Sequence, residues 1–108
     1  MVYTAFDEAL EKMSDKLNDE SIDGWLKGRK GWKRSQDALN KSFDFQSFRD
    51  AIVFVNRVAS LADDLDHHPD MDIRYTTVGL TLTSHSADGL TQKDPKLAEA
   101  VDFATSVP

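Results

Sequence analysis

The sequence of 108 residues contains no cysteine, and this absence excludes several kinds of site. Disulfides, iron–sulfur clusters and zinc sites built on thiolates all require cysteine. The sequence also lacks an apolar run of about 18 residues, the length that a membrane-spanning helix needs. The first residues, MVYTAFDEALEKM, become acidic and polar within one helical turn, unlike a secretory signal. We therefore expect a cytoplasmic protein that does not enter membranes.

Positive charge is scarce as well. The 13 lysine and arginine residues are outnumbered by 19 acidic residues, which leaves a net charge of −6. A general nucleic-acid surface needs a basic patch, so we expect no direct binding of nucleic acid. Hydrophobic residues make up 40% and charged residues 30% of the chain, as in ordinary globular proteins. The length fits a single domain over residues 1–108.

Helical periodicity predicts three helices. The first begins near Thr4, where TAFD reads as a capping box, and ends between residues 18 and 21. The second and clearest begins after an Asp44 N-cap and ends at or just before Asp66, because a histidine pair and Pro69 follow. The last has Asp94 as its N-cap, with apolar positions that face inward, Leu97, Val101 and Ala104.

Two other stretches predict strands. Residues 22–43 contain turn-like glycines and the alternating stretch ALNKSFDF, so we expect short antiparallel strands there. IRYTTVGLTLTSH reads as one long strand that bends at Gly79, with Val78, Leu80 and Leu82 on one face. Tyr75 and His85 fall on the opposite face. Because helices and strands do not alternate as βαβ units, we predict an α+β fold whose helices cover one face of an antiparallel sheet.

A histidine pair stands out in LDHHPDMDIRY. His67 and His68 lie at a helix-to-strand corner, and His85 is the third and last histidine of the chain. Adjacent residues in extended backbone point in opposite directions, which disfavours one metal ion bound by both. Nucleophilic catalysis has no support, since there is neither a cysteine nor a serine in an elbow motif. Proton transfer remains, and a dehydration needs one group to give a proton and another to take one.

The stretch DDLDHHPDMDIRYTTVGLTLTSHSADGLTQKD resembles the signature of the pterin-4a-carbinolamine dehydratases. ALNKSFDFQSFRDAIVFVNRVASLADDL resembles the strand and long helix of that family, and Trp32 matches its hairpin tryptophan. The family pattern is an acid, a His-His-Pro triplet, an aromatic residue, a third histidine and an aspartate. Its matches here are Asp63, His67, His68, Pro69, Tyr75, His85 and Asp94.

This resemblance implies a four-stranded antiparallel sheet with three helices on one face, in the order α-β-β-α-β-β-α. It implies a hydro-lyase that converts 4a-hydroxytetrahydropterin to quinonoid dihydropterin and recycles the pterin of aromatic amino acid hydroxylases. No metal or organic cofactor is expected, and the protein is expected to form a homodimer or homotetramer.

The resemblance also implies roles for individual residues. His67 and His85 exchange protons with the 4a-hydroxyl and the ring N5, and His68 helps to hold the substrate. The positions expected to bind substrate or support the site are Asp63, Pro69, Tyr75, Ser84, Asp94 and Trp32. Many relatives have glutamate at Asp63, animal members have tryptophan at Met71, and Ser84 and Ser86 stand where threonine and often an acid occur.

Each of these residues also has an ordinary structural interpretation. Asp94 fits a helix cap, Tyr75 strand packing, Trp32 the core and His85 a strand surface. An alternative function is a non-enzymatic dimerisation or regulatory protein on the same fold. Another is a pterin-related role near molybdopterin metabolism.

Overall fold

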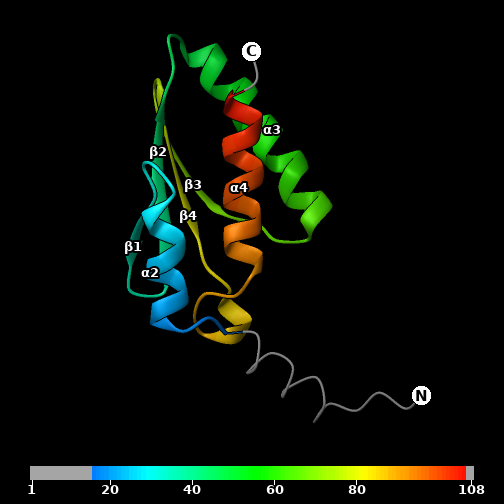
Figure 1. Ribbon diagram of the computed structural model, residues 1–108. Coiled ribbons are helices and arrows are strands. Elements are labelled where there is room, and N and C mark those ends of the chain that lie inside the picture. Colours follow the sequence, from blue (N-terminus) through cyan, green and yellow to red (C-terminus); the bar gives the residue numbers. More distant parts are fainter. Residues whose placement is uncertain (1–15, 107–108) are drawn as a thin grey trace, which may run out of the picture.

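A computed structural model describes residues 16–106 of the chain (Figure 1). The helix expected to begin near Thr4 lies outside the described residues up to position 15. Within the described part, no helix is long and apolar enough to cross a membrane. In chain order, the elements are α2 (Asp19–Lys27), β1 (Lys33–Ser35), β2 (Ala38–Asp44), α3 (Phe48–Leu65), β3 (Asp70–Arg74), β4 (Thr77–Leu82), the 3₁₀ turn η1 (His85–Ala87) and α4 (Lys93–Ser106).

Helix α2 corrects the prediction for residues 18–27. We expected a helix to end and strands to begin there, but a new helix starts. The Asn18 side chain accepts a hydrogen bond from the Ser21 backbone N–H (2.8 Å), and the acidic Asp19 and Glu20 occupy the first turn. Both features favour a helix start. The helix buries Ile22 in the common core, so tertiary packing outweighs the turn preference of DGW.

The sheet has four antiparallel strands in the order β1-β2-β4-β3. The prediction of one long strand over residues 73–85 is wrong, because β3 and β4 form a hairpin. The turn lies at residues 75–76, and Tyr75 has a positive φ of 54° there. The strand ends at Leu82, so His85 lies outside the sheet in η1. Gly79 does not bend the strand but pairs with both neighbours, Ser42 and Asp72.

The predicted inner face of the sheet is confirmed. Val78, Leu80 and Leu82 alternate along β4, and each is at most 1% exposed. Figure 1 shows α3 and α4 side by side along the sheet, and the three helices α2, α3 and α4 contribute to one core with it. This is the predicted α+β arrangement of three helices and a four-stranded antiparallel sheet.

Side-chain and backbone hydrogen bonds define both ends of helix α3. Its N-cap is Ser47, whose hydroxyl accepts from the Asp50 backbone N–H (3.0 Å). The predicted cap, Asp44, is instead the last residue of β2. The predicted end is confirmed, because Leu65 is the last helical residue and Asp66 is the C-cap in the left-handed conformation.

Candidate active site

The end of α3 directs the two histidines to different surroundings. The Asp66 N–H donates to Asp63 O (3.2 Å), and the His67 N–H donates to Ala62 O (3.0 Å), which is the hydrogen-bond pattern of a Schellman motif. Asp66 adopts φ 49°, a conformation that aspartate tolerates better than most residues. After this turn His67 enters the interior, at 9% exposure, whereas His68 is exposed.

His67 contacts a buried carboxylate. Its Nε2 lies 2.6 Å from Asp94 Oδ1, and Asp94 has no exposed surface. The other oxygen, Oδ2, accepts from Ser84 Oγ (2.8 Å) and from the Thr91 backbone N–H (2.9 Å). Because the Ser84 hydrogen is directed to Asp94, Thr91 Oγ1 donates to Ser84 Oγ (2.9 Å). Each oxygen of the buried carboxylate is therefore paired, as a buried charge requires.

These contacts also explain how α4 begins. The helix starts at Lys93, so Asp94 lies in its first turn and is not the predicted N-cap. Thr91 Oγ1 accepts from the Lys93 N–H (3.2 Å) while Asp94 accepts from the Thr91 N–H, a reciprocal arrangement of the capping-box kind. Asp94 therefore serves both the start of the helix and the orientation of His67.

The contact with Asp94 determines which nitrogen of His67 is free. A carboxylate only accepts hydrogen bonds, so Nε2 carries the hydrogen that points to Asp94. In the neutral ring Nδ1 then has a lone pair and can accept a proton.

His68 has a more open environment. Its Nε2 lies 2.9 Å from Asp63 Oδ1, and the two side chains are 60% and 77% exposed. Exposed pairs of this kind contribute little to stability. The Asp63 contact therefore matters mainly for the orientation of the His68 ring.

The three histidines line one pocket of about 400 Å³. It lies between the end of α3, the segment that contains η1, and the start of α4. His85, 17 residues beyond His68 in the sequence, is brought to the same pocket because β4 returns the chain beside the corner after α3. The lining residues are Asp66, His67, His68, Thr83, Ser84, His85, Ser86, Ala87, Thr91, Gln92 and Lys93.

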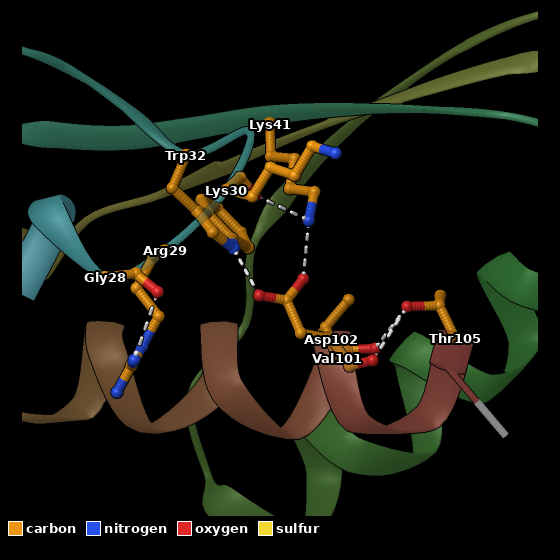
Figure 2. A network of polar contacts seen from close by, with 8 residues as sticks. All are labelled: Gly28, Arg29, Lys30, Trp32, Lys41, Val101, Asp102 and Thr105. Carbon is orange, nitrogen blue, oxygen red and sulfur yellow. Dashed lines mark hydrogen bonds and ion pairs between the residues drawn. The ribbon is translucent and has the colours of Figure 1, made fainter.

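Five predicted supporting residues do not line this pocket, and one of them, Asp94, acts on it through its contact with His67. Asp63 acts on it through His68, and Pro69 follows the histidine pair. Tyr75 is 75% exposed at the β3–β4 turn, and Trp32 is a core residue with 5% exposure. Figure 2 shows the Trp32 indole N–H donating to Asp102 Oδ2 (2.8 Å). The structure thus brings together the histidines, Ser84 and Asp94, but not Trp32 or Tyr75.

Sequence reasoning missed Thr91, Gln92 and Lys93, which line the pocket. One signal was available for Thr91, because TQKD before the apolar positions of α4 has the spacing of a capping box. No local signal distinguishes Gln92 and Lys93 from ordinary polar loop residues. Among residues 16–106, no three histidine, aspartate or glutamate side chains are grouped so that they could hold a metal ion.

A pocket with three imidazoles, one of them held by a buried carboxylate, has the groups that acid–base catalysis on a small molecule requires. The family model described as pterin 4 alpha carbinolamine dehydratase matches residues 15–104. The chain belongs to this family of hydro-lyases.

Individual relatives agree with this assignment. Proteins from Thermomicrobium roseum and Roseiflexus, each named "Putative pterin-4-alpha-carbinolamine dehydratase", are 48% and 47% identical to the chain. The first match covers 77% of this chain and 89% of the relative, and the second covers 83% and 97%. The crystal structure of a "transcriptional coactivator/pterin dehydratase" from Brucella melitensis matches with a TM-score of 0.78 and 32% identity, over 82% of this chain and 96% of that one.

Proposed function

We propose that the protein dehydrates 4a-hydroxytetrahydropterin to quinonoid dihydropterin and water. The observation that carries the proposal is the pocket lined by three histidines, in which Asp94 holds His67 by a 2.6 Å contact. The family of the chain supports the pterin as substrate. Recycling the cofactor of aromatic amino acid hydroxylases is the role that this reaction would serve.

The reaction needs only a redistribution of protons. The C4a–O bond breaks, the oxygen receives a proton and leaves as water, and N5 loses a proton as the C4a=N5 double bond forms. We assign the base to His67, because Asp94 holds its Nε2 and leaves Nδ1 free to accept a proton. We assign the acid to the exposed His85, which can regain its proton from solvent, and substrate orientation to His68.

Three single variants test this assignment in steady-state dehydration. General acid–base steps are typically worth about 10²–10⁴-fold, so His67→Ala should lower kcat by that factor with the fold intact. His85→Ala should have a similar or smaller effect, because water and the other imidazoles can cover part of one proton transfer. His68→Ala should raise KM more than it lowers kcat. If all three match the wild type, the histidine pocket is structural and the proposal fails.

A non-enzymatic binding role on the same fold is the second candidate. One observation favours it, because the related Brucella melitensis protein carries a name that joins "transcriptional coactivator" to "pterin dehydratase". A wild-type protein that neither binds pterins nor dehydrates them, but forms a stable complex with another protein, would replace the dehydratase proposal with this one.

A further inference from the structure

The dipeptide Asp-Gly occurs twice in the chain, and the two copies lie in different surroundings. Asp23 and Gly24 are inside helix α2, whereas Asp88 is the C-cap of η1 and Gly89 follows it. In this dipeptide the glycine nitrogen can attack the carboxyl group of the aspartate before it, because glycine has no Cβ to hinder the approach. The surrounding structure decides whether the nitrogen and the carboxyl group can meet.

Helix α2 protects the first copy. Gly24 lies beyond the first turn of the helix, so its N–H donates to the carbonyl four residues earlier, as in any α-helix. The helix also holds the backbone of Asp23 in one conformation. Closing a ring between Asp23 and Gly24 therefore requires local opening of α2, which costs free energy.

The second copy lacks this protection. Asp88 is exposed, and among residues 16–106 its carboxylate has no hydrogen-bond or ion-pair partner. The Gly89 N–H has only a long contact, 3.5 Å, with Ser84 O, and that oxygen already accepts from the Ala87 N–H (3.0 Å). The attacking nitrogen is thus weakly held, and the carboxyl group is free to turn toward it.

We propose that Asp88 is a site of spontaneous isomerisation to isoaspartate. The Gly89 nitrogen attacks Asp88 Cγ, and the proton of that nitrogen and a carboxyl oxygen leave as water when a five-membered succinimide ring has formed. Water then opens the ring at the former main-chain carbonyl, which becomes a free carboxylate, and Cγ remains bonded to Gly89. No atom is oxidised or reduced. One water is released and one is consumed, so the mass of the chain is unchanged.

The rearrangement alters the loop that carries His85. Ser84 and Gly89 form an antiparallel bridge, in which the Ser84 N–H donates to Gly89 O (3.1 Å). Isoaspartate adds one carbon atom to the main chain between these two residues, or about 1.5 Å of path. The bridge and η1 cannot both keep their geometry, so the lining residues of the histidine pocket in η1 are displaced: His85, Ser86 and Ala87.

Peptide mapping of protein incubated for several weeks at physiological temperature and neutral pH tests the site. Trypsin separates the two copies, into the peptides of residues 17–27 and 75–93. Electron-transfer fragmentation distinguishes isoaspartate from aspartate in each peptide. Because attack by the Gly24 nitrogen requires the loss of at least one helical hydrogen bond, isoaspartate should form at least about fivefold faster at Asp88 than at Asp23.

The effect on the pocket is measured on the same samples and rests on the proposed function. A displacement of about 1 Å can cost about 10²-fold in rate, so isomerised molecules should have at least about tenfold lower kcat. Dehydration activity should then fall nearly in proportion to the isomerised fraction. The NMR signals of the His85 ring should shift in the same fraction, and this readout does not require activity.

Three variants identify the responsible residue, each compared with its own activity before incubation. Asp88→Glu would need a less favourable six-membered ring, so it should remain unmodified and active. Asp88→Asn should lose ammonia and react faster than the wild type, with the rise in mass that replacement of an amide by an acid produces. Asparagine also tolerates the left-handed backbone at φ 54°. The matched control, Asp23→Glu in α2, should lose activity at the wild-type rate.

The outcomes separate this inference from the proposed function. Absence of isoaspartate at Asp88, or equal amounts at Asp88 and Asp23, would overturn the assigned site. Isoaspartate at Asp88 with unchanged activity and unchanged His85 signals would overturn its effect on the pocket and leave the dehydratase proposal standing. If fresh protein has no dehydration activity, the proposed function fails, while peptide mapping and the His85 signals still decide the inference.

Discussion

At the scale of single residues, Asp94 combines complete burial with charge and a contact to a histidine of the candidate site. Burying a carboxylate completely costs free energy of folding unless hydrogen-bond donors contact its oxygens. Here the partners are the His67 ring, the Ser84 hydroxyl and the Thr91 amide. The same contacts that stabilise the buried charge determine the direction of the His67 ring, so under the proposed mechanism folding and catalysis would both depend on this side chain.

Replacing this carboxylate by an amide should separate the two roles. In Asp94→Asn the new NH₂ group can donate to His67 Nε2, which reverses the tautomer and protonates Nδ1 in the resting enzyme. A comparable reversal in a serine-protease triad costs about 10⁴-fold. We expect kcat to fall at least about 10²-fold with a smaller change in KM, measured by steady-state dehydration.

Ser84→Ala is the matched comparison for this prediction. It removes one donor to Asp94 Oδ2 and leaves the His67 contact in place, so it should lower the free energy of unfolding by about 1 kcal/mol with less than about tenfold loss of kcat. Equal losses of kcat in the two variants, with both proteins folded under the assay conditions, would show that the loss does not depend on the His67 tautomer and would contradict this role of Asp94.

At the scale of elements, the observed cap of α3 differs from the one that the sequence suggested. Asp44 is a good N-cap residue, but it pairs with Thr77 at the end of β2 and accepts from the Thr77 hydroxyl (2.7 Å). Strand pairing therefore outcompetes helix capping at this position. Ser47, three residues later, accepts from the Asp50 N–H instead.

Two alanine variants measure this difference in capping. Ser47→Ala should lower the free energy of unfolding by about 1 kcal/mol, the usual cost of losing an N-cap. Asp44→Ala should cost less, since its hydrogen bond is exposed to solvent. Urea denaturation followed by circular dichroism compares them, and a larger loss in Asp44→Ala would contradict the cap assignment.

A polar network joins β2, the segment before β1 and α4. Asp102 on α4 accepts from the Trp32 indole through one oxygen and pairs with Lys41 Nζ (2.8 Å) through the other. Lys41 also donates to Lys30 O (3.1 Å), as Figure 2 shows. This places the predicted site residue Trp32 in an interaction between the sheet and the last helix.

Breaking the network should cost more than breaking an exposed ion pair. Asp102→Ala leaves the partly buried Trp32 and Lys41 donors without their acceptor, so the free energy of unfolding should fall by about 2–3 kcal/mol. Glu99→Ala, one helical turn away, removes the more exposed pair with Arg29 and should cost less than about 1 kcal/mol. Thermal and urea denaturation of both variants provide the comparison, and equal losses would contradict the larger contribution predicted for the contacts of Asp102.

At the scale of the whole molecule, strand β3 is an edge of the sheet at which a strand of another chain could pair. β3 is the last strand in the order β1-β2-β4-β3, and Ile73 on it is 41% exposed. Such an edge is a template for another strand. We predict a symmetric dimer at least, formed partly through this edge or the adjoining sheet face.

Light scattering at micromolar concentration tests the assembly. The expected mass is at least twice the 12.1 kDa of one chain. Ile73→Lys should weaken the dimer, because a desolvated lysine at the edge opposes pairing. Val53→Lys changes an apolar residue on α3 that is 51% exposed, and it should leave the dimer intact. A wild-type protein that is entirely monomeric would contradict the prediction. If only Val53→Lys loses the dimer, the interface involves α3 and not the β3 edge.

The sequence by itself determined the elements whose signals are local. The apolar stripe of α3 and the alternation in β2 and β4 predicted helix and strands, because 3.6-residue and two-residue periods decide which side chains can be buried together. The family pattern also pointed to three histidines. The order α-β-β-α-β-β-α implied by the resemblance has two strands after α3, but the alternation in residues 73–85 was interpreted as one long strand. Tyr75 gave no local signal for the β3–β4 turn, because its positive φ is unusual for that residue.

Only the tertiary structure decided which polar groups meet. His67 and Asp94 are 27 residues apart in the sequence, and no local periodicity describes their contact. It depends on the Schellman turn after α3, the capping arrangement at α4 and the path of the hairpin between them. The same path carries Tyr75 away from the pocket and brings Thr91, Gln92 and Lys93 to it, whereas Trp32, before β1, is buried in the core. Long-range pairing of buried polar groups is decided by the packing of the whole core, which is why the site could be suspected from the sequence but assembled only from the fold.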